Sequence, residues 1–202
     1  MKRIHFSLAA FAAVAMMLVT SVNDPLPIGS AIPKADVKLK DVTGKQQALK
    51  ELVQKNGLLV MFSCNTCPVV KKYQSRTLEV AKEAATNGIG VALLNSNEAS
   101  RDDGDGYADM QAYAKEQGYA FSYLLDEKSS MANLFGALRT PEVFLFDGKG
   151  LLVYHGGIDN NPDAPSEVTR KHLSLAIQEL AAGKEVTMKN TRSVGCVIKR
   201  PE

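Results

Sequence analysis

Two continuous apolar runs mark the first half of the chain. "LLVMF", residues 58–62, and "IGVALLN", residues 89–95, have the length and composition of strands that are buried on both faces of a parallel sheet. Between them, apolar and polar residues alternate with helical spacing over residues 69–85, and the pattern stops before Asn87 and Gly88. The first half therefore predicts a strand, a crossover helix and a second, parallel strand.

Shorter elements are predicted around this unit. The patterns favour a hairpin over residues 36–39 and 46–49, helices over 107–117, 129–135 and 166–182, and strands over 121–125, 142–146 and 151–155. Ser166 is the expected N-cap of the last helix. Strands that begin parallel and end in an antiparallel hairpin predict an α/β domain with a central mixed sheet flanked by helices.

The N-terminus has the layout of a signal peptide. Lys2 and Arg3 precede an apolar run over residues 6–19, and small polar residues follow. We expect residues 1–21 to be cleaved, which makes the protein exported, and periplasmic if the source is a Gram-negative bacterium. An uncleaved anchor is the alternative, but the run is short for a membrane span of about 20 residues. After processing we expect no stable membrane span, an extended arm over residues 22–33 and one domain over residues 34–202.

Charge and cysteine content narrow the functional classes. The chain has 24 Lys and Arg and 22 Asp and Glu residues, and the expected cleavage removes Lys2 and Arg3 without any acid. The mature chain is then close to neutral, so a nucleic-acid partner is not predicted. Its three cysteines all lie in the mature part. In an oxidising compartment thiols tend to pair, and an odd number leaves at least one over.

Cys64 and Cys67 form a CxxC motif at the first strand-to-helix junction. Backbone N–H groups and the positive end of the helix dipole at this junction are expected to lower the pKa of the Cys64 thiol toward neutrality. Cys64 then attacks disulfides and Cys67, one turn further on, resolves them. Pro68 fits the first helical turn. An inert disulfide or part of a metal site is the alternative, although a structural zinc site usually needs two such pairs.

Four stretches carry a resemblance to a known family. They are "IGSAIPKADVKLKDVTGKQQALKEL", "LLVMFSCNTCPVVKKY", "FSYLLDEKSSMANLFGALRTPEVFLFDGKGLLVYHGGID" and "TRSVGCVIKR", which together cover about residues 28–200. They resemble the redoxin group of thioredoxin-fold proteins, which contains peroxiredoxins and exported thiol–disulfide oxidoreductases. The resemblance implies a thioredoxin-like fold with an N-terminal hairpin extension.

The same resemblance implies roles for particular residues. Cys64 matches the nucleophile, Cys67 the resolving thiol, and Pro141 a cis-proline that faces the CxxC, with Thr140 before it. Thr140 and Pro141 are expected to bind the substrate, through pairing of the Thr140 backbone with an extended segment. The implied activity is thiol–disulfide exchange on protein or small-molecule disulfides, with a redox partner protein and no bound cofactor.

Two departures from the family bear on the activity. Thioredoxins bury an acid in the first active-site strand, and Leu58, Leu59 and Val60 provide none. Glu142 is a candidate proton acceptor, although an exposed strand glutamate is the expected alternative. Peroxiredoxins have a threonine three residues before the peroxidatic cysteine, where this chain has Met61. A peroxiredoxin-like thiol peroxidase that uses Cys64 is kept as a second hypothesis.

Three further features leave alternatives open. Cys196 is either a third redox thiol that exchanges with the CxxC or a tail cysteine packed as a small hydrophobic residue. His155 joined to the two cysteines would make a copper-binding or copper-delivery protein, which is a third hypothesis; the leading one has no metal site. The acidic segment over residues 98–106 is expected to be a solvated loop that borders the substrate cleft.

Overall fold

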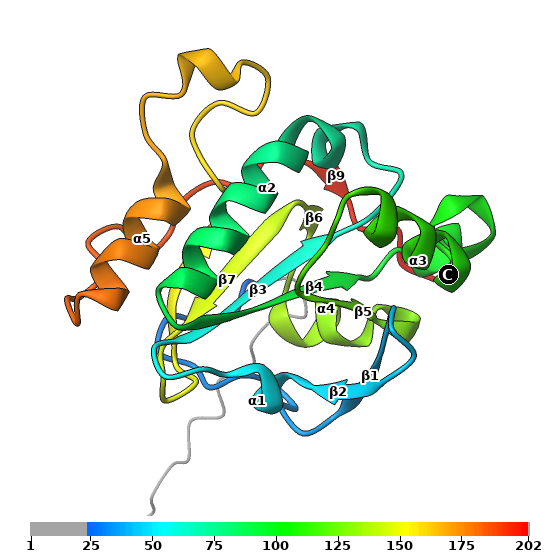
Figure 1. The fold of residues 1–202 in the computed structure, drawn as a ribbon, viewed down its shortest axis with the longest axis horizontal. Coiled ribbons are helices and arrows are strands. Elements are labelled where there is room, and N and C mark those ends of the chain that lie inside the picture. The colour runs from blue at the N-terminus through cyan, green and yellow to red at the C-terminus, as the bar shows by residue number, and fades with distance from the viewer. Residues whose placement is uncertain (1–23, 202) are drawn as a thin grey trace, which may run out of the picture.

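The computed structural model describes residues 24–201 and has a seven-stranded sheet with helices on both faces (Figure 1). The strands of this sheet are β1 (Lys38–Asp41), β2 (Gln46–Ala48), β3 (Gly57–Ser63), β4 (Ile89–Asn95), β5 (Ser122–Leu125), β7 (Glu142–Phe146) and β8 (Leu152–Gly156). A separate two-stranded ribbon joins β6 (Arg139–Thr140) to β9 (Cys196–Val197). The helices are α1 (Leu49–Leu52), α2 (Pro68–Thr86), α3 (Tyr107–Glu116), α4 (Ser130–Phe135) and α5 (His172–Ala181).

The strand order in the large sheet is β2-β1-β5-β4-β3-β7-β8. β3, β4 and β5 run parallel, whereas the pairs β1–β2, β1–β5, β3–β7 and β7–β8 are antiparallel. This arrangement confirms the predicted mixed sheet and the strand–helix–strand unit at its centre. β3 and β4 are buried along their whole length, as expected for strands covered on both faces.

The two faces of the sheet carry separate apolar cores, because successive side chains of a strand point to opposite sides. Leu59 and Met61 of β3 pack with residues of α2, α3 and α5 on one face. Phe62 packs on the other face with Phe135 of α4 and Phe144 of β7. Figure 1 shows α2 on one side of the sheet, and α1 and α4 on the other. The result is a three-layer domain in which the CxxC region lies at the edge where β3 meets α2.

The last helix is shorter than the sequence pattern predicts. Its N-cap is Lys171 rather than Ser166, and residues Pro165–Glu167 form a separate 3₁₀ turn. The side chain of Asn160 explains the difference, because its Oδ1 atom accepts the backbone N–H groups of Thr169 and Arg170 at 3.1 and 3.0 Å. These N–H groups tie down the preceding loop and do not serve a first helical turn.

The acidic segment over residues 98–106 also differs from a plain loop. It contains a 3₁₀ turn, Glu98–Ser100, and an irregular helical turn, Arg101–Asp105, in which Gly104 has a φ of +92°. Arg101 holds this turn in place by donating to the Asn95 and Asp105 carbonyl oxygens at 2.8 and 2.7 Å. The Arg101 guanidinium group therefore ties the segment to the end of β4.

The ends of the chain are described only in part. The predicted signal peptide, residues 1–21, lies outside the described residues. Within the predicted arm, the Leu26 N–H donates to the Phe135 carbonyl at 2.9 Å and the Gly29 N–H to that of Leu152 at 2.8 Å. Across residues 24–201, no helix combines the length and the apolar character that a membrane span requires.

Candidate active site

The CxxC motif lies in the turn between β3 and α2, as predicted. Ser63 ends the strand, Cys67 is the N-cap of the helix, and Pro68 is its first residue. A proline suits this position because its missing N–H would have no partner inside the helix. Both cysteines are enclosed, with Cys64 fully buried and Cys67 3% exposed.

The peptide bond between Thr140 and Pro141 is cis, which confirms the prediction for this pair. β7 begins immediately afterwards and pairs with β3, with Glu142 opposite Phe62, so that Pro141 lies at the same end of the sheet as the CxxC. The Thr140 Oγ1 atom is 3.4 Å from Cys64 Sγ, within the range of a hydrogen bond to sulfur. The Thr140 carbonyl oxygen is 3.4 Å from Cys67 Sγ. One residue thus contacts both sulfurs.

The disulfide in this structure joins Cys67 to Cys196, and Cys64 is a free thiol. This pairing differs from the expected Cys64–Cys67 bond. The two bonded residues are 129 positions apart in sequence, with Cα atoms 6.1 Å apart. β9 brings them together, because it pairs with β6 so that Cys196 stands opposite Thr140. Of the two interpretations of Cys196, the structure favours a third thiol that reaches the CxxC.

β9 also changes the interpretation of Thr140. The sequence predicts that an extended substrate pairs with the backbone of this residue. In this structure the chain's own tail pairs there, through Cys196. The position beside the cis-proline is occupied from within the molecule.

The pKa of the Cys64 thiol is raised, in contrast to the expected decrease toward neutrality. Burial is the main cause, because it disfavours the charged thiolate, and the negative charge of Asp105 adds to it. The Thr140 hydroxyl and the backbone N–H groups of Cys67 and Thr66 act in the opposite direction. The helix begins only at Pro68, so Cys64 stands three residues ahead of the N-cap and not at the first turn.

Asp105 is a site residue that the sequence did not reveal. It is fully buried and reaches the two central residues of the CxxC motif. Its Oδ1 atom accepts the Asn65 backbone N–H at 2.7 Å, and its Oδ2 atom accepts the Thr66 hydroxyl at 2.7 Å. The Asn95 and Asn97 side-chain amides donate to the same carboxylate at 2.9 and 3.0 Å. The carboxylate is fully paired and fixes the turn that carries Cys64.

The only sequence signal for Asp105 was its place in the acidic segment over residues 98–106. That segment was expected to border the substrate cleft, and it does contact the CxxC turn, because the Asn65 side-chain amide donates to the Gly104 carbonyl at 2.9 Å. Gly104 also lies close to Thr66, where an added Cβ would be 3.2 Å from Thr66 Cγ2. Asp105 is therefore a buried acid beside the CxxC turn, and its contacts are with Asn65, Thr66 and two asparagine amides.

Glu142 is 3% exposed, so the expected exposed strand position is wrong. Its Oε2 atom accepts the N–H groups of Leu138 and Arg139, each at 2.8 Å, and its Oε1 atom is 2.7 Å from His155 Nε2. Glu142 therefore holds the backbone that leads into Thr140 and Pro141. No contact joins its carboxylate to a cysteine sulfur among the described residues.

His155 lies in β8 with its ring against Phe144, at a centroid distance of 4.5 Å. Its Nε2 atom is committed to Glu142, and none of residues 24–201 form a group of three or more His, Cys, Asp or Glu side chains able to hold a metal ion. The geometry does not bring His155 together with Cys64 and Cys67 as copper ligands.

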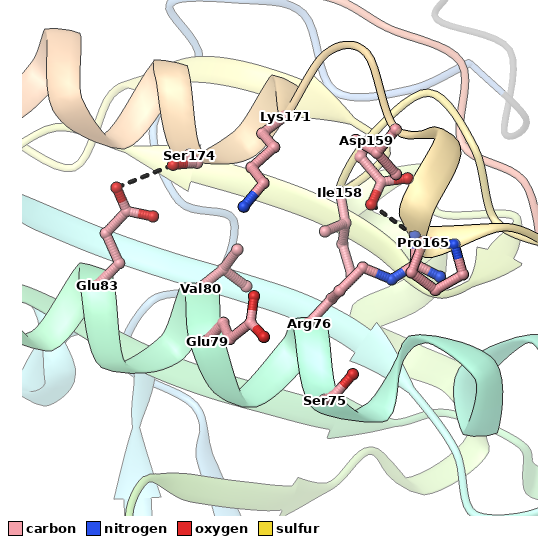
Figure 2. Close-up of a pocket in the computed structure, with 11 residues that line it drawn as sticks. Ser75, Arg76, Glu79, Val80, Glu83, Ile158, Asp159, Pro165, Lys171 and Ser174 are labelled. Atoms are coloured by element: carbon pink, nitrogen blue, oxygen red, sulfur yellow. Dashed lines mark hydrogen bonds and ion pairs between the residues drawn. The ribbon is translucent and has the colours of Figure 1, made fainter.

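A cavity of about 280 Å³ lies between α2 and α5 and contains no cysteine among its lining residues (Figure 2). Arg76 and Asp159 form a buried ion pair of 2.6 Å at one end. At the other end the Ser174 hydroxyl donates to Glu83 at 2.9 Å. Figure 2 shows Lys171 pointing from the start of α5 toward α2. Each of these pairs joins α2 to a segment on the other side of the cavity.

Comparisons with known proteins cover most of the chain. The sequence model of the AhpC/TSA family matches residues 28–155. An uncharacterised conserved protein from Geobacillus kaustophilus is 32% identical, covers 87% of this chain and 93% of its own, and superposes with a TM-score of 0.80. A hypothetical protein from Sinorhizobium meliloti is 34% identical, with coverages of 88% and 97% and the same TM-score of 0.80.

A more distant structure supports the fold alone. The thioredoxin domain of a thiol-disulfide oxidoreductase from Bacteroides vulgatus is 19% identical, covers 64% of this chain and 88% of its own, and has a TM-score of 0.53. The seven-stranded mixed sheet with helices on both faces matches the thioredoxin-like fold.

Proposed function

Because this chain belongs to the AhpC/TSA family, we propose that it is an exported thiol–disulfide oxidoreductase in which Cys64 and Cys67 carry out a dithiol–disulfide cycle. The main support for the proposal is that three cysteines and a cis-proline lie close together. Thr140 Oγ1 lies 3.4 Å from Cys64 Sγ, its carbonyl oxygen lies 3.4 Å from Cys67 Sγ, and Cys67 is bonded to Cys196. Sulfur atoms in such proximity exchange disulfides when one of them ionises.

The proposed reaction transfers two electrons from the cysteines to a substrate disulfide. The Cys64 thiolate attacks one substrate sulfur, the other substrate sulfur leaves as a thiolate, and a mixed disulfide forms. Cys67 then loses its proton and attacks Cys64 Sγ, which closes the Cys64–Cys67 bond and releases the second substrate thiol. The Thr140 hydroxyl, 3.4 Å away, donates to the ionised Cys64 sulfur. The cysteines themselves hold the electrons, so the reaction needs no bound cofactor.

Cys67 is available for this reaction only after its bond to Cys196 is reduced. The disulfide-bonded form with a buried, free Cys64 is therefore the oxidised form of the enzyme. A redox partner protein or a small dithiol supplies the electrons that open it. The substrate, a protein or small-molecule disulfide, approaches Cys64 beside Thr140 and Pro141 through side-chain contacts, because β9 already pairs with the Thr140 backbone. After cleavage of residues 1–21 the basic and acidic side chains balance, which argues against a nucleic-acid partner.

Insulin reduction in the presence of dithiothreitol tests the activity. The wild-type chain is expected to accelerate precipitation of the insulin B chain, and Cys64→Ser is expected to fall to the uncatalysed rate. Cys67→Ser serves as the matched variant, because it keeps the attacking thiol and is expected to accumulate a mixed disulfide with the substrate. Wild-type activity in Cys64→Ser would contradict the role of Cys64, provided that circular dichroism shows both variants folded.

A thiol peroxidase activity at Cys64 is the second candidate, favoured by the complete burial of this thiol, because a small oxidant reaches a buried sulfur more readily than a protein disulfide does. The thiolate would attack a peroxide oxygen, release the alcohol and become a sulfenic acid, and Cys67 would then form the disulfide and release water. Peroxide consumption with dithiothreitol as reductant separates the candidates. A rate far above that of free cysteine, with no effect on insulin, would replace the first proposal by the second.

A further inference from the structure

The tail strand β9 is held on both sides of Cys196 by contacts that do not involve the disulfide. Downstream, Ile198 is 3% exposed and packs in the core that contains Phe62, and its N–H donates to the Leu138 carbonyl at 2.9 Å. The Lys199 N–H donates to Asn97 Oδ1 at 3.0 Å. Upstream, the Thr191 N–H donates to the His155 carbonyl at 3.0 Å. Reduction of the disulfide therefore leaves Cys196 tethered over the active site.

Gly195 permits the close approach of this strand to β6. A Cβ atom at this position would lie 2.1 Å from the Thr140 carbonyl oxygen, far inside van der Waals contact. The Arg139 guanidinium donates to the Gly195 carbonyl at 3.1 Å. Gly195 therefore packs closely against Thr140, the residue before the cis-proline.

The three cysteines differ in their exposure to solvent. Cys64 is fully buried and Cys67 is 3% exposed, whereas Cys196 is only half-buried. An external thiol must reach a sulfur directly in order to open a disulfide. A Cys64–Cys67 bond would join two buried residues, whereas a Cys67–Cys196 bond includes the one cysteine of the three that is partly exposed.

We propose that Cys196 is a third catalytic thiol, which takes the disulfide from the CxxC pair and presents it to the external reductant. This inference rests on the proposed function. In the step that follows substrate turnover, the Cys196 thiolate attacks Cys67 Sγ, the Cys64–Cys67 bond breaks, and Cys64 leaves with the electron pair and takes up a proton. The product is the Cys67–Cys196 bond of this structure, with Cys64 again a thiol. The step moves one disulfide and neither gains nor loses electrons.

Re-reduction follows from the same geometry. An external thiolate attacks Sγ of the partly exposed Cys196, the Cys67–Cys196 bond breaks, and Cys67 leaves as a thiolate. Cys67 is the N-cap of α2, where the positive end of the helix dipole stabilises an anion. A second external thiol then releases Cys196 as a thiol and leaves as part of an external disulfide. The tail thereby carries the cysteine that exchanges with the external thiol.

The relay is tested by mapping disulfides during a single turnover. The reduced full chain is mixed with one equivalent of bis(2-hydroxyethyl) disulfide, quenched in acid at successive times, alkylated and mapped by peptide mass spectrometry. In the wild type, Cys64–Cys67 is expected first and Cys67–Cys196 later. In Cys196→Ser the first bond is expected to form at the wild-type rate and to persist. Its turnover with dithiothreitol is expected to fall about tenfold or more, because the remaining disulfide is buried.

Gly195→Ala and Ser193→Ala form a matched pair in the same tail. Gly195→Ala keeps all three thiols but pushes β9 away from Thr140, so formation of the Cys67–Cys196 bond is expected to slow by about 100-fold, as misplacement of reacting groups typically does. Ser193→Ala, which removes only a hydroxyl from the tail, is expected to behave as wild type. A wild-type rate in Gly195→Ala would show that the close packing of Gly195 against Thr140 is not needed for the exchange.

The outcomes separate the relay from the proposed function. A wild-type chain whose final disulfide under turnover is Cys64–Cys67, or a Cys196→Ser variant that turns over at the wild-type rate, overturns the relay alone. A wild-type chain that consumes no disulfide overturns the proposed function, and the relay with it.

Discussion

At the scale of single residues, burial, Thr140 and Asp105 are the main influences on Cys64, which lies three residues ahead of the N-cap of α2. Thr140 offers a hydroxyl 3.4 Å from the sulfur, and Asp105 places a buried negative charge behind the turn that carries it. Burial and this charge both raise the pKa of the Cys64 thiol. Asp105 therefore exerts two effects, since it fixes the Asn65 and Thr66 backbone and opposes ionisation of the nucleophile.

Asp105→Asn is expected to lower the pKa of the Cys64 thiol, because the variant removes the negative charge that opposes the thiolate. It is also expected to lower the free energy of unfolding by about 1–3 kcal/mol, since an amide cannot accept all the hydrogen bonds of the carboxylate. The pKa is measured from the ultraviolet absorbance of the thiolate, in a background with Cys67 and Cys196 both changed to Ser. Urea denaturation gives the stability.

Asp103→Asn is the matched control, because Asp103 is an exposed acid of the same segment and should leave the pKa of Cys64 unchanged. A pKa that stays the same or rises in Asp105→Asn would show that its charge has no influence on the nucleophile.

At the scale of elements, α2 has two roles, one at its N-terminus and one in its middle. Its N-terminus carries Cys67, and its middle anchors the loop that follows β8. Arg76 donates to Asp159 at 2.6 Å and to the carbonyl oxygens of Asn161 and Pro162 at 2.8 and 2.9 Å. The Tyr73 hydroxyl donates to the other Asp159 oxygen at 2.9 Å. This buried cluster holds the loop and α5 against α2.

Arg76→Ala is expected to lower the free energy of unfolding by about 3–5 kcal/mol, because it leaves the Asp159 carboxylate buried without its charged partner. Lys72→Ala breaks an exposed ion pair with Asp163 on the same helix and is expected to cost no more than about 1 kcal/mol. Urea denaturation of the oxidised proteins measures both. Equal losses in the two variants would contradict the importance of burial for this pair.

At the scale of the whole molecule, the local patterns predicted most of the sheet and its central unit. β3 and β4 are contiguous apolar runs, and the hydrophobic effect alone buries such runs at the centre of a sheet. The features that were missed depend on contacts between distant residues. β9 has only two residues and no periodic pattern, and it is specified by its fit to β6. Asp105 and Glu142 carry no local signal of burial, because each is buried by polar partners that come from other elements.

The pairing of the cysteines is the clearest case of this limit. The spacing of Cys64 and Cys67 predicts a bond between neighbours, whereas the tertiary structure offers Cys67 a partner 129 residues away. The CxxC spacing locates the region of the proposed nucleophile. The path of the tail determines which two cysteines form the disulfide.

A redox titration of the full chain tests whether the stable disulfide joins Cys67 to Cys196 or Cys64 to Cys67. The protein is equilibrated with thiol buffers of increasing reducing power, denatured in acid and alkylated, and each cysteine is quantified by mass spectrometry. We expect Cys67 and Cys196 to become alkylated together at one potential, and Cys64 to be alkylated at every potential. Alkylation of Cys196 at every potential, with Cys64 and Cys67 changing together, would contradict this expectation.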